Sequence, residues 1–258
     1  MAHLITAFQE RVSKGSLTMV SVKTFGLLNA ILLSLAAVPF CTCAIPPLTT
    51  TMTTTTRLGP RTSKGGSGEN GGFYWHFWTD GVGDVDYENG PEGLYSVNWT
   101  HSNNFLGGKG WNPGTTDRRI TYSADVFEPS GNGYLSVYGW TKDPPRLEYY
   151  VVEAYGTFDP TRLFSSNASR KVTIEADGGT YVMGRKRFVS LGGQVTDQLY
   201  SVRDAKDRRT AGTVNMKLHF SAWEQKLGVK FGTLDFQIVA TEGYQSSGRS
   251  QIRVEKAD

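Results

Sequence analysis

The sequence predicts an all-β fold of two packed, curved antiparallel sheets, a sandwich or jelly roll, with one short α-helix. From Phe73 onward, β-branched and aromatic residues occur in short runs separated by Gly, Asn, Asp and Pro, which is the pattern of strands joined by turns. Turn sequences such as Asp177-Gly178-Gly179 stand between these runs and suit hairpin connections. One later stretch follows helical spacing instead. A β domain of this size with a single helix favours two sheets packed face to face.

The chain before this domain has a different composition. Residues 19–44 begin at a methionine, carry one lysine and continue as an apolar run of small residues, which predicts a secretory signal peptide. Residues 1–18 would then be an upstream extension. Residues 45–72 are rich in Thr, Gly and Ser and predict an unfolded pro-segment or linker, so we assign the folded domain to residues 73–258. The alternative to a signal peptide, a membrane anchor, is disfavoured because the apolar run is short and interrupted.

Cysteine and charge exclude several classes of function. Cys41 and Cys43, the two cysteines of the chain, both lie in the predicted signal peptide, so the mature protein would have neither disulfide nor thiol chemistry. The formal net charge of the whole chain is +3. Most of this positive excess lies in residues 1–44, which precede the predicted mature protein. We therefore expect no nucleic-acid partner and interpret Arg185-Lys186-Arg187 as a solvated strand face. No metal-ligand spacing and no nucleotide loop is present, so neither metal nor cofactor is predicted.

The strand runs are short and separated by turn residues, and Asp80, Asp84, Asp86 and Asp125 are interpreted as turn formers. The helix is predicted where Phe220, Trp223 and Leu227 recur on one face, and it should stop at Gly228. The predicted strands are residues 95–99, 119–122, 134–140, 147–154, 171–175, 179–188, 197–203, 213–217, 231–240 and 250–254.

Two strand-like runs each place one carboxylate beside a tyrosine. In a strand, residues two apart share a face, so Glu148 lies with Tyr150 and Glu242 lies with Tyr244. Glu153 falls on the opposite face from Glu148 by the same count. If the two strands line one surface, they present a pair of carboxylates among aromatic rings, which is the equipment for cleaving a glycosidic bond.

Aromatic residues are frequent around these runs, and Tyr138 and Trp140 share one strand face. A flat ring can cover the apolar face of a sugar, and a phenol hydroxyl can bond its polar rim. Core packing is the alternative for any one of these rings. The combination of Tyr138, Trp140, Tyr150 and Tyr244 with two carboxylates favours a binding cleft.

Several motifs in order resemble one known family. LEYYVVEAYGTFDP (147–160) and VATEGYQSSG (239–248) resemble the two catalytic signatures of glycoside hydrolase family 11, the endo-1,4-β-xylanases. The resemblance extends over residues 73–258. It includes FWTDG (77–81), YSVNWT (95–100), NFLGGKGWNPG (104–114), GNGYLSVYGW (131–140), SVR (201–203) and HFSAW (219–223).

The resemblance implies a jelly roll shaped like a partly closed right hand that cleaves xylan with retention of configuration. Glu148 is then the nucleophile and Glu242 the general acid/base, with carboxyl groups about 5–5.5 Å apart. Matching positions imply that Trp78, Tyr138, Tyr150, Arg185 and Gln198 contact the substrate or the nucleophile. Asn104 matches the position beside the acid/base, where an amide implies a near-neutral optimum. His219 matches a buried structural histidine.

The chain departs from the family at the thumb loop, which reads Val189-Ser190-Leu191 and is shorter than usual. One alternative is therefore a xylan-binding relative with little or no catalysis, and another is a jelly-roll glucanase. Asn98 and Asn167 each begin an N-glycosylation sequon. We expect a secreted monomer that acts outside the cell.

Overall fold

A computed structural model describes residues 61–62, 64–143, 146–164, 172–189 and 195–256. The predicted upstream extension, the signal peptide and most of the linker lie outside the described residues, as do Asn167 and the thumb residues Ser190 and Leu191. The described residues are mostly strand, with one α-helix and one short 3-10 helix, which confirms the all-β prediction. Within these residues, no helix has both the length and the apolar character that crossing a membrane requires.

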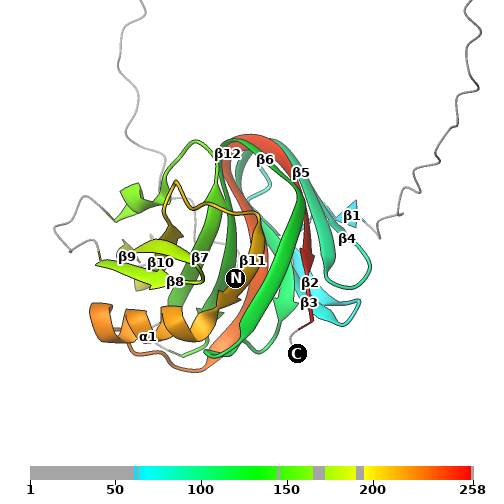
Figure 1. Cartoon of the computed structure of the whole chain (residues 1–258). Helices are drawn as coiled ribbons and strands as arrows, with labels where there is room; N and C mark the ends of the chain where they lie inside the picture. Colours follow the sequence, from blue (N-terminus) through cyan, green and yellow to red (C-terminus); the bar gives the residue numbers. More distant parts are fainter. Residues whose placement is uncertain (1–60, 63, 144–145, 165–171, 190–194, 257–258) are drawn as a thin grey trace, which may run out of the picture. The chain divides into compact units, whose positions relative to one another are not determined.

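The elements follow one another in the order that Figure 1 shows. The helices are η1 (Pro160–Leu163), a 3-10 helix, and α1 (Met216–Leu227). The strands are β1 (Arg61–Thr62), β2 (Gly66–Asn70), β3 (Phe73–Thr79), β4 (Asp84–Asn89), β5 (Leu94–Trp111), β6 (Arg119–Thr141), β7 (Leu147–Tyr155), β8 (Val172–Ala176), β9 (Gly179–Val189), β10 (Val195–Arg203), β11 (Ala211–Asn215) and β12 (Leu234–Val254).

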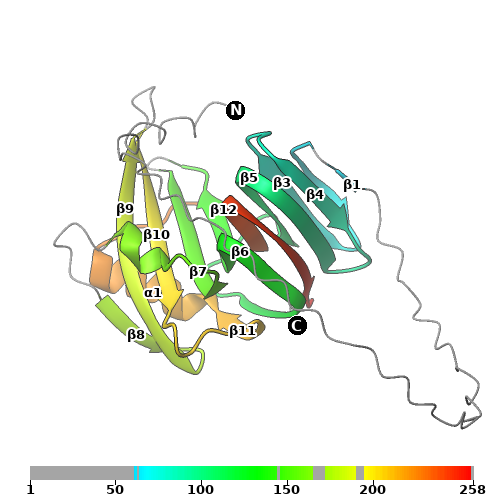
Figure 2. The ribbon, with the colours of Figure 1, turned by 90° about the horizontal axis from the view of Figure 1, so that it is seen from above.

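Hydrogen-bonded neighbours run in the order β1-β4-β5-β12-β6-β7-β10-β9-β8, with β3 also beside β5, β2 beside β3 and β11 beside β6. Figure 2 shows these strands side by side in that order. All the pairs are antiparallel except β7 with β10, which run parallel. This parallel pair differs from the purely antiparallel prediction. It arises because β8, β9 and β10 are connected as a meander beyond the far edge of β7.

Three long strands bend at the same height of the sheet. Positive φ angles mark the bends at His101 (49°), Gly131 (116°) and Gln245 (47°). Cross-strand pairing places Ser102 opposite Ser246 just past these bends. Beyond its bend, β5 exchanges β4 for β3 as its partner. The sheet therefore folds over itself, and its two halves enclose the main core. Several of the short runs that the sequence predicts are halves of these long strands.

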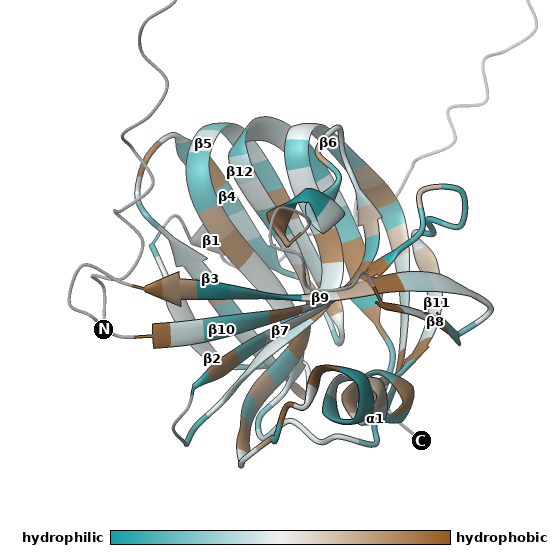
Figure 3. Cartoon of the chain, turned by 90° about the vertical axis from the view of Figure 1, so that its left-hand side faces the viewer, coloured by the Kyte–Doolittle hydropathy of each residue, from teal (hydrophilic) through white to brown (hydrophobic). Residues whose placement is uncertain are grey.

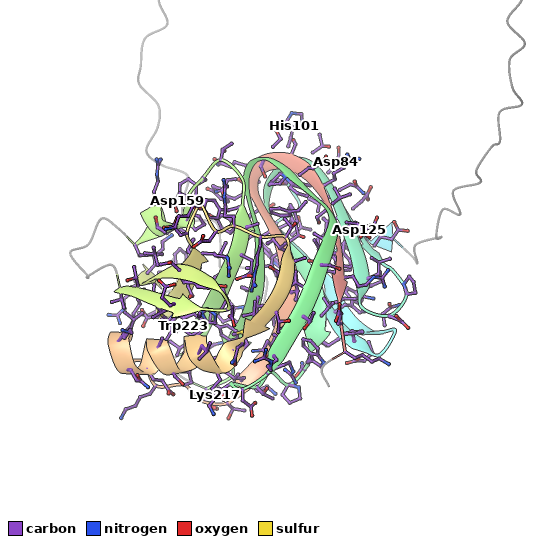
Figure 4. All side chains as sticks on the ribbon, in the orientation of Figure 1. Asp84, His101, Asp125, Asp159, Lys217 and Trp223 are labelled. Atoms are coloured by element: carbon purple, nitrogen blue, oxygen red, sulfur yellow. The ribbon has the colours of Figure 1, made fainter. Side chains whose placement is uncertain are left out.

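The helix α1 covers the core-facing side of β8 and β9, as seen below them in Figure 1. It begins at Met216, inside the predicted strand 213–217 and four residues before the predicted apolar pattern starts. It ends at Leu227, and the next residue, Gly228, has a φ of 65°, the left-handed conformation that glycine adopts readily. Figure 3 shows hydrophobic and hydrophilic residues on different sides of this helix. Trp223, labelled in Figure 4, is fully buried and donates a hydrogen bond to the carbonyl of Tyr200.

Two local predictions are corrected by the strands. Residues 66–70 lie in the predicted linker but form β2, which pairs with β3. A Cβ on Gly66 or Gly68 would approach the ring of Trp75 to 3.2 Å, so the glycines there allow close packing and do not indicate an unfolded segment.

Asp80 lies in the turn after β3, as predicted, and its Oδ1 accepts a hydrogen bond from the backbone N–H of Val82. The other three aspartates interpreted as turn formers lie in strands. Asp84 and Asp86 are exposed residues of β4 that alternate with buried Val85 and Tyr87, and Asp125 is exposed in β6. Figure 4 labels Asp84 and Asp125 at the surface of these strands. In both strands the polar residue occupies the solvent side of an alternating pattern.

Candidate active site

One face of the sheet gathers the predicted catalytic residues. Tyr138 of β6 pairs with Tyr150 of β7 on one side and with Ile238 of β12 on the other. Strand alternation then puts Glu148, two residues before Tyr150, and Glu242, four residues after Ile238, on the same face. We call this side of β3, β5, β12, β6, β7, β10 and β9 the site face. The opposite side of the same strands packs into the main core.

Glu148 accepts three hydrogen bonds on the site face. The hydroxyls of Tyr138 and Tyr150 donate to its Oε1 at 2.7 and 2.8 Å, and Nε2 of Gln198 donates to its Oε2 at 2.7 Å. Glu148 is only 7% exposed. Burial raises its pKa, and the three donors act against this rise because they stabilise the charged form. The carboxylate of Glu148 is therefore held in a fixed orientation by three hydrogen bonds.

The donor Gln198 is itself held in place by a tyrosine. The hydroxyl of Tyr200 donates to Oε1 of Gln198 at 3.3 Å, which leaves the amide nitrogen directed at Glu148. The Tyr200 ring also stacks on Tyr150, with ring centroids 4.8 Å apart and planes 6° from parallel. Tyr200 thus positions two of the three donors to the carboxylate, Gln198 and Tyr150.

Glu242 has a different environment on the same face. Its Oε2 is buried and has no hydrogen-bond partner among the described residues. Burial and the negative charge of Glu148 together raise the pKa of Glu242 to about 8, against a smaller opposing effect of Lys186. The two carboxyl groups therefore interact electrostatically, and Glu242 is the one that keeps a proton near neutral pH.

Other predicted site residues lie along the same rows of the sheet. Trp78 of β3 pairs with Leu106 of β5, and Leu106 pairs with Glu242. Asn104 pairs with Tyr244, one step further along the same two strands. All three predicted residues in these rows are partly exposed.

Trp140 lies beside Glu148 in the strand pairing. Its indole N–H donates to the hydroxyl of Tyr138, and the guanidinium of Arg146 lies 4.8 Å from its ring centre. Trp140 therefore holds Tyr138 in the position from which that hydroxyl reaches the carboxylate.

Arg185 is not brought to the site face. It pairs with Leu199, a core residue, and its guanidinium forms an ion pair with Asp197. Arg187, which is on the same side of β9, also contacts Asp197, at 2.9 Å. Lys186 between them points the other way. The charged run that the sequence presents as one patch is thus divided between two faces by strand alternation.

Three features of the site face are not among the predicted site residues. Lys186 and Tyr200 are two of them. The third is an aromatic platform, in which Phe236 stacks with His76 at 4.7 Å and contacts Tyr74 at 5.8 Å between ring centres. Alternation within β9 and β3 could have grouped the residues of each strand, but which group faces the carboxylates depends on the pairing between strands.

A buried Ser–His–Asp line lies on the other side of the sheet. Oγ of Ser201 is 2.8 Å from Nδ1 of His219, and Nε2 of His219 is 3.1 Å from Asp177. Ser201 and His219 are both fully buried, so no substrate can reach the hydroxyl. The arrangement joins α1 to β10 and agrees with the structural interpretation of His219.

No group of three or more His, Cys, Asp or Glu side chains within the described residues could hold a metal ion. Asn98, the first predicted glycosylation site, is exposed in β5.

Comparison with known proteins adds an independent line of evidence. The sequence profile of "Glycosyl hydrolases family 11" matches residues 70–253. "Endo-1,4-beta-xylanase 4" of Pyricularia oryzae is 50% identical over 194 residues, which cover 74% of this chain and 80% of that protein. "Endo-1,4-beta-xylanase B" of Phanerodontia chrysosporium is 46% identical over 207 residues (78% and 68%), and "Endo-1,4-beta-xylanase 11A" of Humicola insolens is 45% identical over 197 residues (75% and 86%).

Proposed function

The chain belongs to glycosyl hydrolases family 11, and from this premise we propose that it is an endo-1,4-β-xylanase in which Glu148 is the nucleophile and Glu242 the general acid/base. The relatives that it matches over most of its length carry the name of that activity. The substrate is xylan, and the bonds cleaved are internal β-1,4 linkages. The family resemblance implies these residue roles, and the geometry of the site supports them.

One observation supports these roles above the others: the two carboxyl groups lie on one face but differ in hydrogen bonding and in the effects on their pKa. Glu148 receives three donors that favour its ionised form. Glu242 has a buried oxygen without a donor and a pKa raised to about 8. An ionised nucleophile beside a protonated acid is the starting state of a retaining glycosidase.

In the first step, the Glu148 carboxylate attacks the anomeric carbon of the sugar. The bond from that carbon to the glycosidic oxygen breaks, and the proton of Glu242 passes to this leaving oxygen. The products are a glycosyl ester on Glu148, an ionised Glu242 and a shortened chain with a new hydroxyl.

In the second step, Glu242 takes a proton from water, whose oxygen attacks the same carbon and releases Glu148 as a carboxylate. Esterified Glu148 carries no charge, so one of the two causes that raise the pKa of Glu242 has disappeared at this stage. The free carboxylate of Glu242 is therefore favoured when a base is needed.

The aromatic residues of the site face would bind the sugars on either side of the cleaved bond. Trp78 and Tyr244 flank Glu242 along the sheet, and Trp140 flanks Glu148. Because Arg185 is paired with Asp197 on the other face, we assign Arg185 no contact with the xylan. We further propose that the enzyme is secreted, with residues 19–44 as its signal peptide, and acts as a monomer.

The test is the release of reducing sugar from xylan by the parent chain, Glu148→Gln and Glu242→Gln. Both variants should lose activity by on the order of a thousandfold or more. The matched control is Glu128→Gln, which alters an exposed glutamate of β6 that pairs with Arg249 and should leave the rate unchanged. Proton NMR of the first product formed should show the β-anomer.

Other outcomes would contradict the proposal. Xylan binding without product by the parent would favour a non-catalytic relative. Equal rates on xylan and carboxymethylcellulose would favour a glucanase. An active Glu148→Gln variant would remove Glu148 from the role of nucleophile.

A further inference from the structure

Lys186 is a cation on the site face. It pairs with Gln198 of β10, and Gln198 pairs with Glu148 of β7, so the three residues form one row across three strands. Gln198 and Glu148 are joined on this face by the 2.7 Å hydrogen bond. Since cross-strand partners point to the same side of a sheet, the lysine side chain leaves β9 on the side of the two carboxylates.

The surroundings of Lys186 favour interaction with both carboxyl groups. It is partly buried, and burial lowers its pKa while Glu148 and Glu242 raise it. Several other titratable groups share this face on the described strands, namely Tyr74, His76, Tyr134, Tyr138, Glu148, Tyr150, Tyr155, Tyr200, Glu242 and Tyr244.

The charges closest to Lys186 along β9 point elsewhere. Arg185 and Arg187 leave the strand on the opposite face, where both pair with Asp197. The short helix η1, which packs on β9, carries an exposed Arg162. Burial raises the pKa values of Tyr150 and Tyr200 well above the ordinary value of a tyrosine, so these hydroxyls remain neutral. Among the described residues of this face, Lys186 is the cation that acts on both carboxyl groups, while Arg146 lies against the Trp140 ring.

We propose that Lys186 is a positioning residue of the active site, whose positive charge acts on Glu148 and Glu242 together, so that the site is a cluster of two carboxyl groups and one ammonium. This inference rests on the proposed function. The positive charge keeps Glu148 ionised at lower pH than burial alone would allow. It also opposes the rise in the pKa of Glu242. The lysine thereby sets the pH range in which one carboxyl is ionised and the other protonated.

The direction of the effect follows from the sign of the charge. Lys186 lowers the pKa of both Glu148 and Glu242. Without it, both values rise. The acidic limb of the activity profile reports ionisation of Glu148, and the alkaline limb reports deprotonation of Glu242. The whole profile should therefore move to higher pH, and a change in folding or in substrate contact would not move both limbs this way.

The experiment measures kcat/KM on soluble xylan from pH 4 to 10 for the parent, Lys186→Met and Lys186→Arg. In Lys186→Met both limbs should rise by about half to one pH unit, the size of a charge–charge interaction at a partly buried site. Lys186→Arg keeps the charge and should keep the profile. Arg187→Met is the matched control, because it removes a neighbouring charge from the opposite face, and it should leave both limbs in place.

Unmoved limbs in Lys186→Met, or an equal shift in Arg187→Met, would overturn the proposal. Lys186→Gln provides the same test with a polar side chain if the methionine variant does not fold. Carbon-13 NMR titration of the glutamate carboxyls measures the two pKa values without turnover. An inactive parent would thus contradict the proposed function, whereas unshifted carboxyl titrations in the variant would contradict the role of Lys186.

Discussion

Gln198 donates a hydrogen bond of 2.7 Å to Oε2 of Glu148 across the parallel pair of β10 and β7, in which the two residues are direct partners. The other carboxylate oxygen accepts from two tyrosines. Both oxygens of the nucleophile are thus held by donors that come from three adjacent strands. One of these donors, Gln198, comes from the strand that runs parallel to β7.

Replacing Gln198 with methionine should raise the pKa of Glu148, because a donor to its charged form is lost. A hydrogen bond to a charged group contributes about 1.5–3 kcal/mol, so the acidic limb of kcat/KM should move up by roughly one to two pH units. The alkaline limb should change little. A pH-rate profile on xylan measures both limbs.

The matched control for this variant is Gln251→Met, which alters a glutamine on β12 that bonds to Asp125 at the surface. It should leave the profile of the parent. If Gln198→Met lowers the rate equally at every pH, then Gln198 acts on the substrate and not on the ionisation of Glu148.

The pKa of Glu242 sets a second prediction, for the parent enzyme at alkaline pH. Glu242 must carry a proton to act as acid, and its pKa is raised to about 8. Activity should therefore be present below this value and fall as the pH rises through about 8. The neutral amide of Asn104, near Glu242 in the strand pairing, adds no further acid to the site. The profile of kcat/KM on xylan checks this limb.

The charge of Glu148 is one cause of the raised pKa, and this cause can be removed separately. In Glu148→Gln, carbon-13 NMR titration should show a lower pKa for Glu242 than in the parent. An unchanged value would mean that burial alone raises it. An alkaline limb below pH 6 in the parent would contradict the protonation state assigned to Glu242.

The sequence was sufficient for the part of the site that depends on alternation within one strand. The pairs Glu148 with Tyr150 and Glu242 with Tyr244 each need a spacing of two residues. The single helix was also identified, since Phe220, Trp223 and Gly228 are local signals. The predicted helix began too late, however, because Met216 was assigned to the preceding strand. Met216 is buried and lies four positions before Phe220, so it belongs to the same apolar face of α1.

The assignment of faces in β9 could not be made in this way. Arg185 and Lys186 are adjacent basic residues, and alternation says only that they point to opposite sides. Their pairing with Leu199 and Gln198 decides which one meets the carboxylates. This register depends on contacts between distant parts of the chain. For the same reason, the contact of His219 with Asp177 could not be predicted from spacing.

Ser201→Ala should leave catalysis intact, although Ser201 contacts a histidine that contacts an aspartate. The serine is fully buried behind the sheet, so it cannot meet a substrate. Loss of the hydroxyl leaves Nδ1 of His219 without its hydrogen-bond partner, which should lower the free energy of unfolding by about 1–3 kcal/mol. Urea unfolding and initial rates on xylan measure the two effects. A loss of activity at temperatures where the variant stays folded would contradict the structural role.

Glu153 is a buried carboxylate that the proposed mechanism does not use, and it connects three parts of the fold. It is 1% exposed. The hydroxyls of Tyr122 and Tyr181 both donate to it. Nε of Arg209 forms an ion pair with its Oε2, and Nη1 of Arg203 lies 4.0 Å from its Oε1. On the core side of the sheet, the carboxylate thereby joins β7 to β6, to β9, and to the end of β10 with the segment that follows it.

Glu153→Gln should therefore destabilise the protein while leaving the pH profile unchanged. The amide keeps the shape of the carboxylate but leaves two arginines without their counter-charge, and breaking a buried ion pair in this way typically costs about 3–5 kcal/mol. Urea unfolding measures this change. Glu128→Gln, which breaks an exposed pair with Arg249, is the control and should have little effect because water screens such pairs. Equal stability of the two variants would show that the core cluster contributes no more than a surface pair.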